Sequence, residues 1–315
     1  TPEMEDARLP RSFAPGSEWL YVKVYTGKGC ADSVLLSALQ PAMQEALASG
    51  AAQGWFFIRY GDPDWHLRLR VHGAPQRLLG EVLPALHRAL AALMADGSVW
   101  RVQLDTYERE CERYGGAVGM PLSEQLFQAD SEAAAGLLAA LPAVDREETR
   151  WQWTLLGIDR LLDDLGLDFE TKWAVISHAR ERFGEELKVD ALFQRELGAR
   201  FRVERAGLES LRAGKGAAAA AMAVLERRSR RLAPVAAALH RAEQSGQLGT
   251  LVAVLAVSYI HMHANRMLRS AARAQELVIY DFLERLYQSE SARARRSAPR
   301  QVARSQQQFE GASCP

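Results

Sequence analysis

Residues 54–60 (GWFFIRY), 61–64 (GDPD) and 66–72 (HLRLRVH) decide the fold of this chain. Two apolar segments on either side of a short turn with Pro63 predict two neighbouring antiparallel strands. Because side chains alternate between the faces of a strand, the second segment has one cationic and one apolar face. The cationic face carries His66, Arg68, Arg70 and His72, and the apolar face carries Leu67, Leu69 and Val71.

The cationic face of this strand has two possible roles. Most charged residues are exposed, so the arginines of an amphipathic strand can simply face solvent. Two guanidinium groups on one strand face can instead bind carboxylates or phosphates through paired hydrogen bonds. The strand pattern by itself favours solvated arginines, and other segments must decide between the two roles.

The segments around the hairpin complete an α+β pattern over residues 19–120. The order βαββαβ predicts a ferredoxin-like antiparallel sheet with helices on one face, and leaves the other face free to carry a site. The predicted elements besides the hairpin are a strand at Trp19–Tyr25, a helix at Ala31–Ser49 interrupted near Pro41, a helix at Pro75–Met94 and a strand at Val99–Tyr107.

From Leu122 onward nearly the whole sequence predicts helix, with breaks at glycine and proline residues. We therefore expect residues 121–288 to be a mostly helical part of the same domain. Residues 1–18 are expected to be a flexible N-terminus, and the arginine-rich residues 289–315 a disordered tail. The predicted helices lie near residues 131–140, 146–165, 169–186, 190–210, 217–244 and 248–288.

The composition is that of an ordinary globular protein. Of the 315 residues, 48% are hydrophobic and 25% charged, and the formal net charge is zero. This balance gives no reason to expect direct binding to nucleic acid or to a membrane surface. No run of about 18 apolar residues predicts a transmembrane helix. Cys30, Cys111 and Cys314 are far apart and form no C-x-x-C pair, which favours a reducing cytoplasm over a zinc or disulfide framework.

A charged segment, residues 105–116 (DTYERECERYGG), directly follows the last predicted strand. Its alternating charges can form a salt-bridged loop or short helix that closes the α+β part. They can also place Glu110 and Arg113 at the mouth of a site formed with the arginine strand. The charge pattern alone favours the structural role.

The otherwise apolar helical segment 258–267 (SYIHMHANRM) contains polar residues. His261 and Asn265 are four residues apart and share one helix face. A single histidine on such a helix is usually a buried core residue, whereas a histidine near Asn and Arg can transfer protons at neutral pH. His263 lies on another face, and the zinc motif H-E-x-x-H is absent, so no metal site is predicted.

A third polar segment, residues 123–131 (SEQLFQADS), precedes the predicted helix Ala133–Leu141. We expect Asp130 or Ser131 to cap that helix. The chain contains no G-x-G-x-x-G, P-loop, G-x-S-x-G or kinase motif, which leaves little support for a redox cofactor or for phosphoryl transfer.

Taken together, these segments resemble the C-terminal elimination domain of class I lantibiotic dehydratases, which also occurs free-standing in lanthipeptide and thiopeptide biosynthesis. The similarity extends from about Trp19 to Tyr287. The family's long N-terminal glutamylation domain is missing here, so we expect a stand-alone form or an excised domain. The matching segments are 19–27 (WLYVKVYTG), 55–73 (WFFIRYGDPDWHLRLRVHG), 105–116, 126–131 (LFQADS), 258–267 and 275–287 (QELVIYDFLERLY).

The resemblance implies the second stage of a dehydration. A partner transfers glutamate from glutamyl-tRNA to a Ser or Thr hydroxyl of a ribosomal precursor peptide. The elimination domain then removes the Cα proton and expels glutamate, leaving dehydroalanine or dehydrobutyrine. Such a step needs a base, stabilisation of enolate-like charge and a grip on the departing carboxylate, and preorganised cations suit the last two tasks. No cofactor is implied.

The family motifs assign roles to individual residues of this chain. Arg68 and Arg70 match the arginine pair of the strand motif, and Arg113 with Glu110 matches the charged pair before the two glycines. We expect the arginines to bind glutamate and stabilise charge, with Glu110 orienting Arg113. His261 matches the functional histidine of the H-x-x-x-N-R helix and is the candidate for proton transfer. Asn265 is expected to contribute to substrate binding.

The resemblance also implies partners and leaves alternatives open. A separate tRNA-dependent glutamylation protein is the expected partner besides the precursor peptide, and a homodimer is possible. Thiopeptide pyridine synthases share the domain but join two dehydroalanines in a formal [4+2] cycloaddition and eliminate the leader peptide. Such enzymes have no need of glutamate-binding arginines. A non-catalytic module that docks an extended peptide on its sheet is the alternative from another class.

Overall fold

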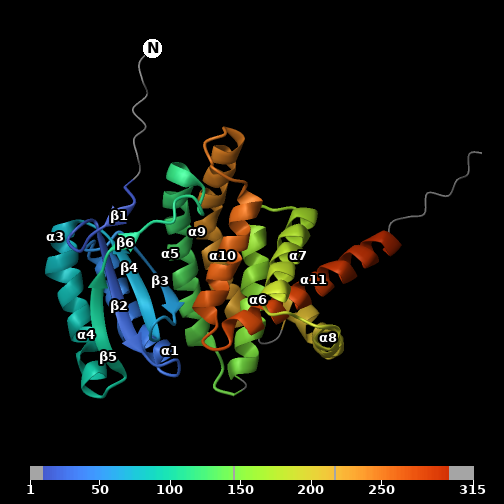
Figure 1. Ribbon diagram of the computed structural model, residues 1–315, viewed down its shortest axis with the longest axis horizontal. Coiled ribbons are helices and arrows are strands. Elements are labelled where there is room, and N and C mark those ends of the chain that lie inside the picture. Colours follow the sequence, from blue (N-terminus) through green and yellow to red (C-terminus); the bar gives the residue numbers. More distant parts are fainter. Residues whose placement is uncertain (1–9, 145, 216–217, 298–315) are drawn as a thin grey trace, which may run out of the picture.

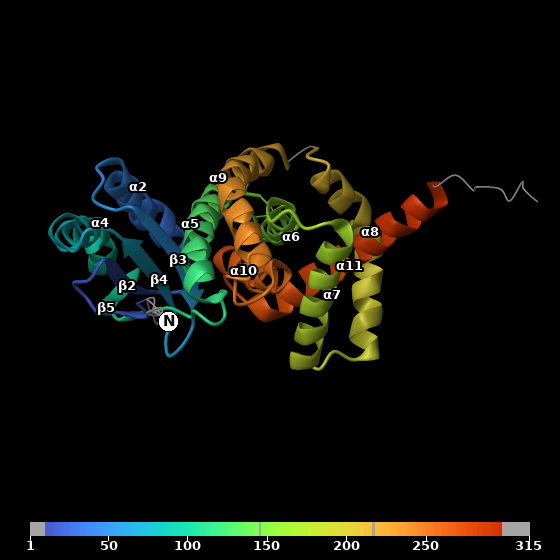
Figure 2. The same cartoon turned by 90° about the horizontal axis from the view of Figure 1, so that it is seen from above.

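The computed structural model describes residues 10–144, 146–215 and 218–297, which form an α/β half followed by a helical half (Figure 1). Figure 2 shows the two halves side by side, with α5 (Gly116–Ala140) at the junction between them. The α+β class predicted from the sequence is confirmed.

The main sheet contains β2 (Trp19–Thr26), β3 (Gly54–Tyr60), β4 (His66–His72) and β5 (Val99–Asp105). Its strand order is β3-β4-β2-β5, and every neighbouring pair is antiparallel. This is the order that a ferredoxin-like βαββαβ chain produces. The short strands β1 (Ser12–Phe13) and β6 (Tyr107–Glu108) pair separately, so part of the expected flexible N-terminus is ordered, and Phe13 is buried. Residues 1–9 of that prediction lie outside the described part.

The sheet separates its side chains as the alternation predicts. Leu67, Leu69 and Val71 are almost completely buried under the helices that cover one face. On the opposite face, Arg70 lies between Tyr21 of β2 and Phe56 of β3 in the strand register. This second face is the one that meets the helical half.

The helices that cover the sheet contain two π-helical segments, each next to a proline. The first path is α1 (Ala31–Val34), η1 (Leu35–Leu39) and α2 (Gln40–Ala48), and the second is α3 (Pro75–Arg77), η2 (Leu78–Val82) and α4 (Leu83–Ala95). Pro41 and Pro84 have no N–H to donate to the preceding turn, and a local widening accommodates that loss. The interruption predicted near Pro41 therefore takes the form of a π segment rather than a break.

One helical stretch among the described residues, Pro75–Ala95, is long and apolar enough to cross a membrane by length and composition. Leu78, Val82, Leu86 and Leu90 bury one side of it in the core of the α/β half. A helix that packs on a sheet in this way passes the same test, so the stretch is weak evidence for a membrane span.

The helical half packs against the edge strand β3. Its first helix, α5, and the helix that carries the predicted histidine, α10 (Val252–Met267), both contact β3. The Asn265 side chain accepts from the Arg59 backbone N–H and donates to its carbonyl, at 2.9 Å each, as a neighbouring strand would. The remaining helices are α6 (Arg146–Asp164), α7 (Phe169–Glu186), α8 (Ala191–Arg212), α9 (Ala218–Gln244) and α11 (Ala272–Ser297).

The prediction that Asp130 or Ser131 caps a helix is wrong. Helix α5 begins at Gly116 and continues through both residues, which are completely buried. Both side chains bind groups from distant segments: Asp130 pairs with arginines and a histidine, and the Ser131 hydroxyl accepts from the Phe57 backbone N–H. Polar residues that cap helices near in sequence can equally satisfy buried groups far away.

The helix predicted over residues 248–288 is two helices, α10 and α11. Helix α10 ends at Met267, where buried arginine side chains donate hydrogen bonds to its last carbonyl groups. Arg59 Nε donates to Arg266 O, and Arg150 Nη1 donates to Met267 O. Helix α11 continues to Ser297, so residues 289–297 of the expected disordered tail are helical. The rest of that tail lies outside the described residues.

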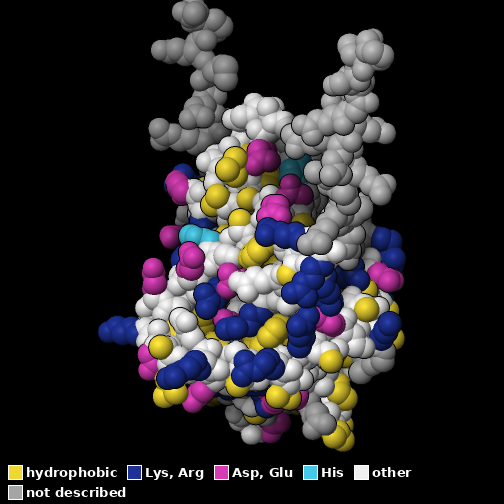
Figure 3. All heavy atoms as spheres, turned by 90° about the vertical axis from the view of Figure 1, so that its right-hand side faces the viewer, with side chains coloured by type: hydrophobic (Ala, Val, Ile, Leu, Met, Phe, Trp, Pro, Cys, Tyr) yellow, Lys and Arg dark blue, Asp and Glu magenta, His cyan; other side chains and the backbone are white. Residues whose placement is uncertain are grey.

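Figure 3 shows the far end of the helical half, where Lys and Arg side chains are numerous among scattered apolar ones. Helix α8 contributes exposed apolar residues to the helical half, including Val203, which is 81% exposed. Figure 1 places this end on the side of the molecule away from the α/β half. The cationic side chains here are therefore separate from the arginines of β4.

Candidate active site

A narrow cavity lies where the open face of the sheet meets α5 and α10. Its volume is about 40 Å³, which is room for one or two small polar groups. The β4 arginine strand, the charged segment before α5 and the H-x-x-x-N-R helix all contribute to it. The lining residues are Phe56, Ile58, Arg70, Tyr107, Glu108, Glu110, Tyr114, Met120, Phe127, Met262 and Arg266.

Arg70 lies in an aromatic cage at this cavity. Its guanidinium carbon is 4.7 Å from the ring centre of Tyr21, 4.9 Å from that of Tyr107 and 5.3 Å from that of Phe56. Burial lowers the pKa of Arg70, yet an arginine stays charged in a protein. Its Nε is buried without a hydrogen-bond partner, and no carboxylate among the described residues forms an ion pair with it. The cage therefore holds a cation without an ion pair among the described residues, and the nearby charge of Glu110 favours its charged form.

Arg68 lies on the same face of β4 but outside the cavity. Its guanidinium stacks on Tyr60, 3.3 Å from the ring centre, and its Nε donates to His66 Nε2 at 3.0 Å. His66 Nδ1 in turn contacts the Asp64 carbonyl at 2.7 Å, so the ring donates from Nδ1 and accepts at Nε2. Burial lowers the pKa of His66, which agrees with this neutral form.

The charged segment before α5 connects the sheet to α10. Arg113 Nη1 donates to Glu110 Oε2 at 3.0 Å, and its Nε donates to Ser258 Oγ on α10 at 3.3 Å. The segment then turns through Gly115, whose φ is +81° and where a Cβ atom would lie 2.7 Å from Leu248. Glu110 lines the cavity, while Arg113 is an exposed residue beside it.

His261 and Asn265 occupy different places from the cavity lining. Met262 and Arg266, one position further along α10, are the residues of this helix that line the cavity. His261 Nδ1 lies 2.8 Å from Glu276 Oε2 on α11, and 25% of the His261 side chain is exposed. The amide oxygen of Asn265 accepts from the backbone of β3 and its amide nitrogen donates to it, so its visible role is to join the two halves rather than to bind substrate.

A buried ionic network lies behind the cavity. The Asp130 carboxylate accepts from Arg228 Nη1 and Arg266 Nη1, both at 3.0 Å, and contacts His263 Nδ1 at 2.8 Å. All four side chains are completely buried. Burial alone would raise the pKa of Asp130, but His263 and the two arginines hold it well below its usual range.

This network also fixes the floor of the cavity. Arg266 Nε donates to the Phe57 carbonyl and to Ser131 Oγ, both at 3.0 Å, which links α10 to β3 and α5. Arg266, Asp130 and Glu276 are site residues that the sequence motifs did not predict. A charged residue inside an otherwise apolar helix, such as Asp130 or Arg266, was the available signal.

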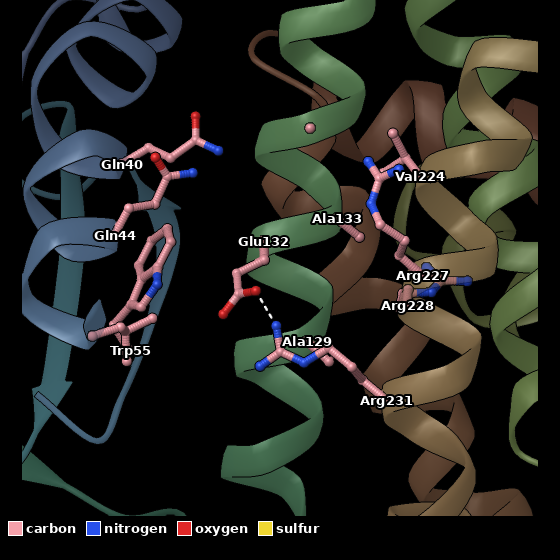
Figure 4. Close-up of a pocket in the computed structure, with 12 residues that line it drawn as sticks. Gln40, Gln44, Trp55, Ala129, Glu132, Ala133, Val224, Arg227, Arg228 and Arg231 are labelled. Atoms are coloured by element: carbon pink, nitrogen blue, oxygen red, sulfur yellow. Dashed lines mark hydrogen bonds and ion pairs between the residues drawn. The ribbon is translucent and has the colours of Figure 1, made fainter. Parts of the chain in front are cut away.

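A larger cavity of about 290 Å³ lies on the other side of β3, between α2, α5 and α9 (Figure 4). Figure 4 shows the Gln40 and Gln44 side chains pointing from α2 into this space. On its other side, Arg231 of α9 forms an ion pair with Glu132 of α5. Trp55, on the opposite face of β3 from Phe56, forms one wall. None of the residues predicted to act on substrate lines this space, so we place the candidate site in the smaller cavity.

The described residues contain no group of three or more His, Cys, Asp or Glu side chains that could hold a metal ion. The charged and aromatic groups that line the smaller cavity are instead two arginines, two glutamates and several aromatic rings. Such a set can bind an anion and stabilise developing negative charge.

A family model described as "Lantibiotic biosynthesis dehydratase C-term" matches residues 19–287. The chain belongs to the lantibiotic dehydratase C-terminal family. This membership supports an enzyme that modifies peptides.

Two curated relatives agree with the family assignment. Over 158 residues, half of this chain, it is 32% identical to the nisin biosynthesis protein NisB of Lactococcus lactis subsp. lactis. Over 167 residues, 53% of the chain, it is 29% identical to the subtilin biosynthesis protein SpaB of Bacillus subtilis. The matched regions cover only 15% and 16% of those relatives.

Solved structures show the same fold. The tRNA-dependent lantibiotic dehydratase MibB of Microbispora sp. 107891 matches 89% of this chain, with a TM-score of 0.73 and 25% identity. The match covers 29% of the MibB chain. TbtD, a pyridine synthase from thiomuracin biosynthesis, matches 87% with a TM-score of 0.62 and 16% identity, over its whole length. At that identity the TbtD match is evidence for the fold alone.

Proposed function

We propose that this chain eliminates glutamate from glutamylated Ser or Thr residues of a ribosomal precursor peptide. The products are dehydroalanine or dehydrobutyrine and free glutamate. The observation that carries the proposal is Arg70, a half-buried cation in an aromatic cage that forms no ion pair with an acidic side chain among the described residues. A cation that is partly removed from water and lacks an ion pair is costly, and a ligand carboxylate would supply the partner.

The arginines suit the two electrostatic tasks of the reaction. As the Cα proton leaves, negative charge develops on the adjacent carbonyl, and as the Cβ–Oγ bond breaks, the departing oxygen becomes a carboxylate of glutamate. Preorganised cations in a water-poor site stabilise both charges. We assign Arg70 to the carboxylate inside the cavity. Arg68 and Arg113 are assigned to substrate groups that extend from it, and Glu110 to the orientation of Arg113.

His261 is the proposed proton-transfer group, because it is partly exposed on α10 beside the junction. Ser258 and Asn265, one turn before and one turn after it, both contact the α/β half. Arginines stay protonated and cannot serve as the base. Since His261 does not line the cavity, the substrate Cα would lie between the cavity mouth and α10.

The reaction implies two partners, the precursor peptide and a tRNA-dependent glutamylation activity. We propose a cytoplasmic location, since glutamyl-tRNA is found there, and no cofactor. A homodimer remains a prediction from the family resemblance.

The alternative function is pyridine formation, because TbtD has the same fold over its whole length. That reaction joins two dehydroalanines and releases a leader peptide, so it has no leaving carboxylate for Arg70 to hold. Mass spectrometry separates the two reactions: elimination lowers the peptide mass by one glutamic acid for each ester, whereas cyclisation releases a leader fragment.

The direct test supplies a chemically glutamylated peptide to the purified protein. We expect wild-type protein to release glutamate, and Arg70→Ala and His261→Ala to lose most of this activity. Arg101→Ala is the matched control, since Arg101 also stacks on a tyrosine of the open sheet face but lies on the edge strand β5. Wild-type rates in both site variants would overturn the assignment of these residues.

A further inference from the structure

A buried carboxylate stands behind the proposed proton-transfer histidine. Glu276 lies in the first turns of α11 and is only 1% exposed. Its Oε2 atom is 2.8 Å from His261 Nδ1. A carboxylate is rarely buried without partners, so this contact is a built feature of the fold rather than an incidental surface pair.

The same oxygen of Glu276 has a second partner. The Tyr280 hydroxyl, one turn further along α11, lies 3.0 Å from Oε2. Burial and the adjacent Glu276 raise the pKa of Tyr280 well above its ordinary value, so the phenol stays protonated and donates. Glu276 therefore accepts from Tyr280, and its remaining lone pairs can accept from His261.

A carboxylate that accepts from Nδ1 decides which nitrogen of a neutral imidazole carries the proton. The hydrogen atom then resides on Nδ1, and Nε2 has a free lone pair. No other described residue forms a hydrogen bond with the His261 ring. The phenyl ring of Phe183 on α7 packs near the His261 ring, with 6.2 Å between the ring centres, and so restricts the orientations of the imidazole.

We propose that Glu276 is a positioning residue that holds His261 in the Nδ1–H form, so that Nε2 accepts the Cα proton of the substrate. The inference rests on the proposed elimination function. In the step itself, the Cα proton moves to Nε2, the Cα–H electron pair becomes the Cα=Cβ bond, and the Cβ–Oγ pair leaves with the glutamate carboxylate. Glu276 then stabilises the imidazolium that forms, without taking the proton.

Other charged groups near His261 do not replace Glu276 in this role. Arg113 reaches the same face of α10 through Ser258 and cannot accept a proton. Arg273 on α11 stacks on Phe183, 4.8 Å from its ring centre, and forms an ion pair with Glu186. Glu276 is thus the one carboxylate in hydrogen-bond contact with His261 among the described residues.

The first test measures the tautomer directly and needs no substrate. With ¹⁵N-labelled histidine, the ring shifts of His261 are recorded at an alkaline pH well above the ordinary pKa of a histidine and assigned with His261→Ala. We expect the Nδ1–H tautomer in wild type and in the control Glu284→Gln, which removes a carboxylate two turns further along α11. In Glu276→Gln the preference for Nδ1–H should be weakened or lost. An Nε2–H tautomer in wild type overturns the inference.

The second test compares elimination kinetics on a glutamylated peptide. We expect Glu276→Gln to lower kcat by about 100-fold or more with little change in KM, because binding is left intact and only the base is misdirected. Glu276→Asp keeps a carboxylate and should recover part of the loss, which separates positioning from a folding defect. Thermal unfolding of each variant identifies any that fail to fold.

The outcomes distinguish this inference from the proposed function. If His261→Ala eliminates glutamate at the wild-type rate, the role of His261 is wrong, whatever the tautomer shows. If His261→Ala is inactive while folded Glu276→Gln retains both the wild-type rate and the wild-type tautomer, the positioning role of Glu276 is wrong and the proposed function stands.

Discussion

Two arginines line the same cavity and differ in the partners that the protein gives them. Arg266 belongs to α10 and is paired with Asp130, the Phe57 carbonyl and Ser131. Arg70 belongs to β4, is surrounded by aromatic rings and has no ion pair among the described residues. The first arginine is held by the protein itself, whereas the second has its binding capacity still available.

The difference separates structural from functional charge. Taking a cation out of water costs several kcal/mol, and a paired cation recovers this through its partners. An unpaired one is tolerated where it serves another purpose, and the aromatic cage of Arg70 lessens the cost through cation–π contacts. Substituting Arg266 should therefore mainly lower stability, and substituting Arg70 should mainly lower activity.

The largest effect is expected from Arg266→Met. The substitution leaves the buried Asp130 carboxylate with fewer cationic partners and removes a link between α10 and β3. We expect the free energy of unfolding to fall by about 3–5 kcal/mol. Urea unfolding measures the change, and Arg101→Met, whose pair with Asp64 is exposed at 3.5 Å, should change it by about 0–1 kcal/mol. Equal losses in the two variants would contradict the structural role of Arg266.

The substitution Arg70→Met tests the other side of the comparison. We expect glutamate release to fall by about 100- to 1000-fold, the cost of removing one preorganised charge-stabilising group. Stability should stay the same or rise, because a half-buried cation without an ion pair is replaced by an apolar chain of similar length. Rates on glutamylated peptide and urea unfolding give both numbers. A strongly destabilised variant would mean that Arg70 is a structural residue after all.

A substitution at an uncharged residue can also strain the network around Asp130. A Cβ atom at Gly157 of α6 would lie 2.1 Å from His263 Nε2, and His263 is held on its other side by Asp130. We expect Gly157→Ala to destabilise the fold by about 1–3 kcal/mol, since the histidine has no room to move.

Gly184→Ala is the matched control for this substitution. Gly184 also lies inside a helix, α7, but nothing lies within 4 Å of an added Cβ atom. Alanine there should stabilise by about 0.5–1 kcal/mol, because glycine is a poor helix former. Thermal or urea unfolding should therefore move in opposite directions for the two variants. If both variants become more stable, the His263 side chain can move away from the added Cβ atom.

The sequence predicted the strand that carries Arg70, but not the ionic network that holds Arg266. Alternation in residues 66–72 predicted the two faces of β4, and the order of elements predicted the ferredoxin-like sheet, because both depend on neighbouring residues. The pairing of Asp130 with Arg228 and Arg266 joins residues about 100 and more positions apart, and no local pattern encodes it. The same polar signal fitted a helix cap equally well.

The sequence likewise predicted residues of the candidate site but not their arrangement in space. The family motifs selected Arg70, Glu110 and His261, but not whether they meet. The structure brings Arg70 and Glu110 to one cavity and turns His261 toward Glu276 instead. Helical spacing assigned Asn265 to the face of His261, yet its amide closes the edge of β3, which only the packing of the two halves reveals.

The smallest effect is expected from Glu110→Gln, at the exposed rim of the cavity. Glu110 and Arg113 form an ion pair at 3.0 Å, with 63% and 40% of their side chains exposed. Exposed pairs contribute about 0–1 kcal/mol, so losing the orientation of Arg113 should raise KM for the glutamylated peptide by at most about 5-fold and leave kcat nearly unchanged. Steady-state kinetics at low and high salt check this, since added salt should reduce the difference between variant and wild type. A loss as large as that of Arg70→Met would mean that Glu110 acts on the substrate itself, and that the rim contributes as much as the caged arginine below it.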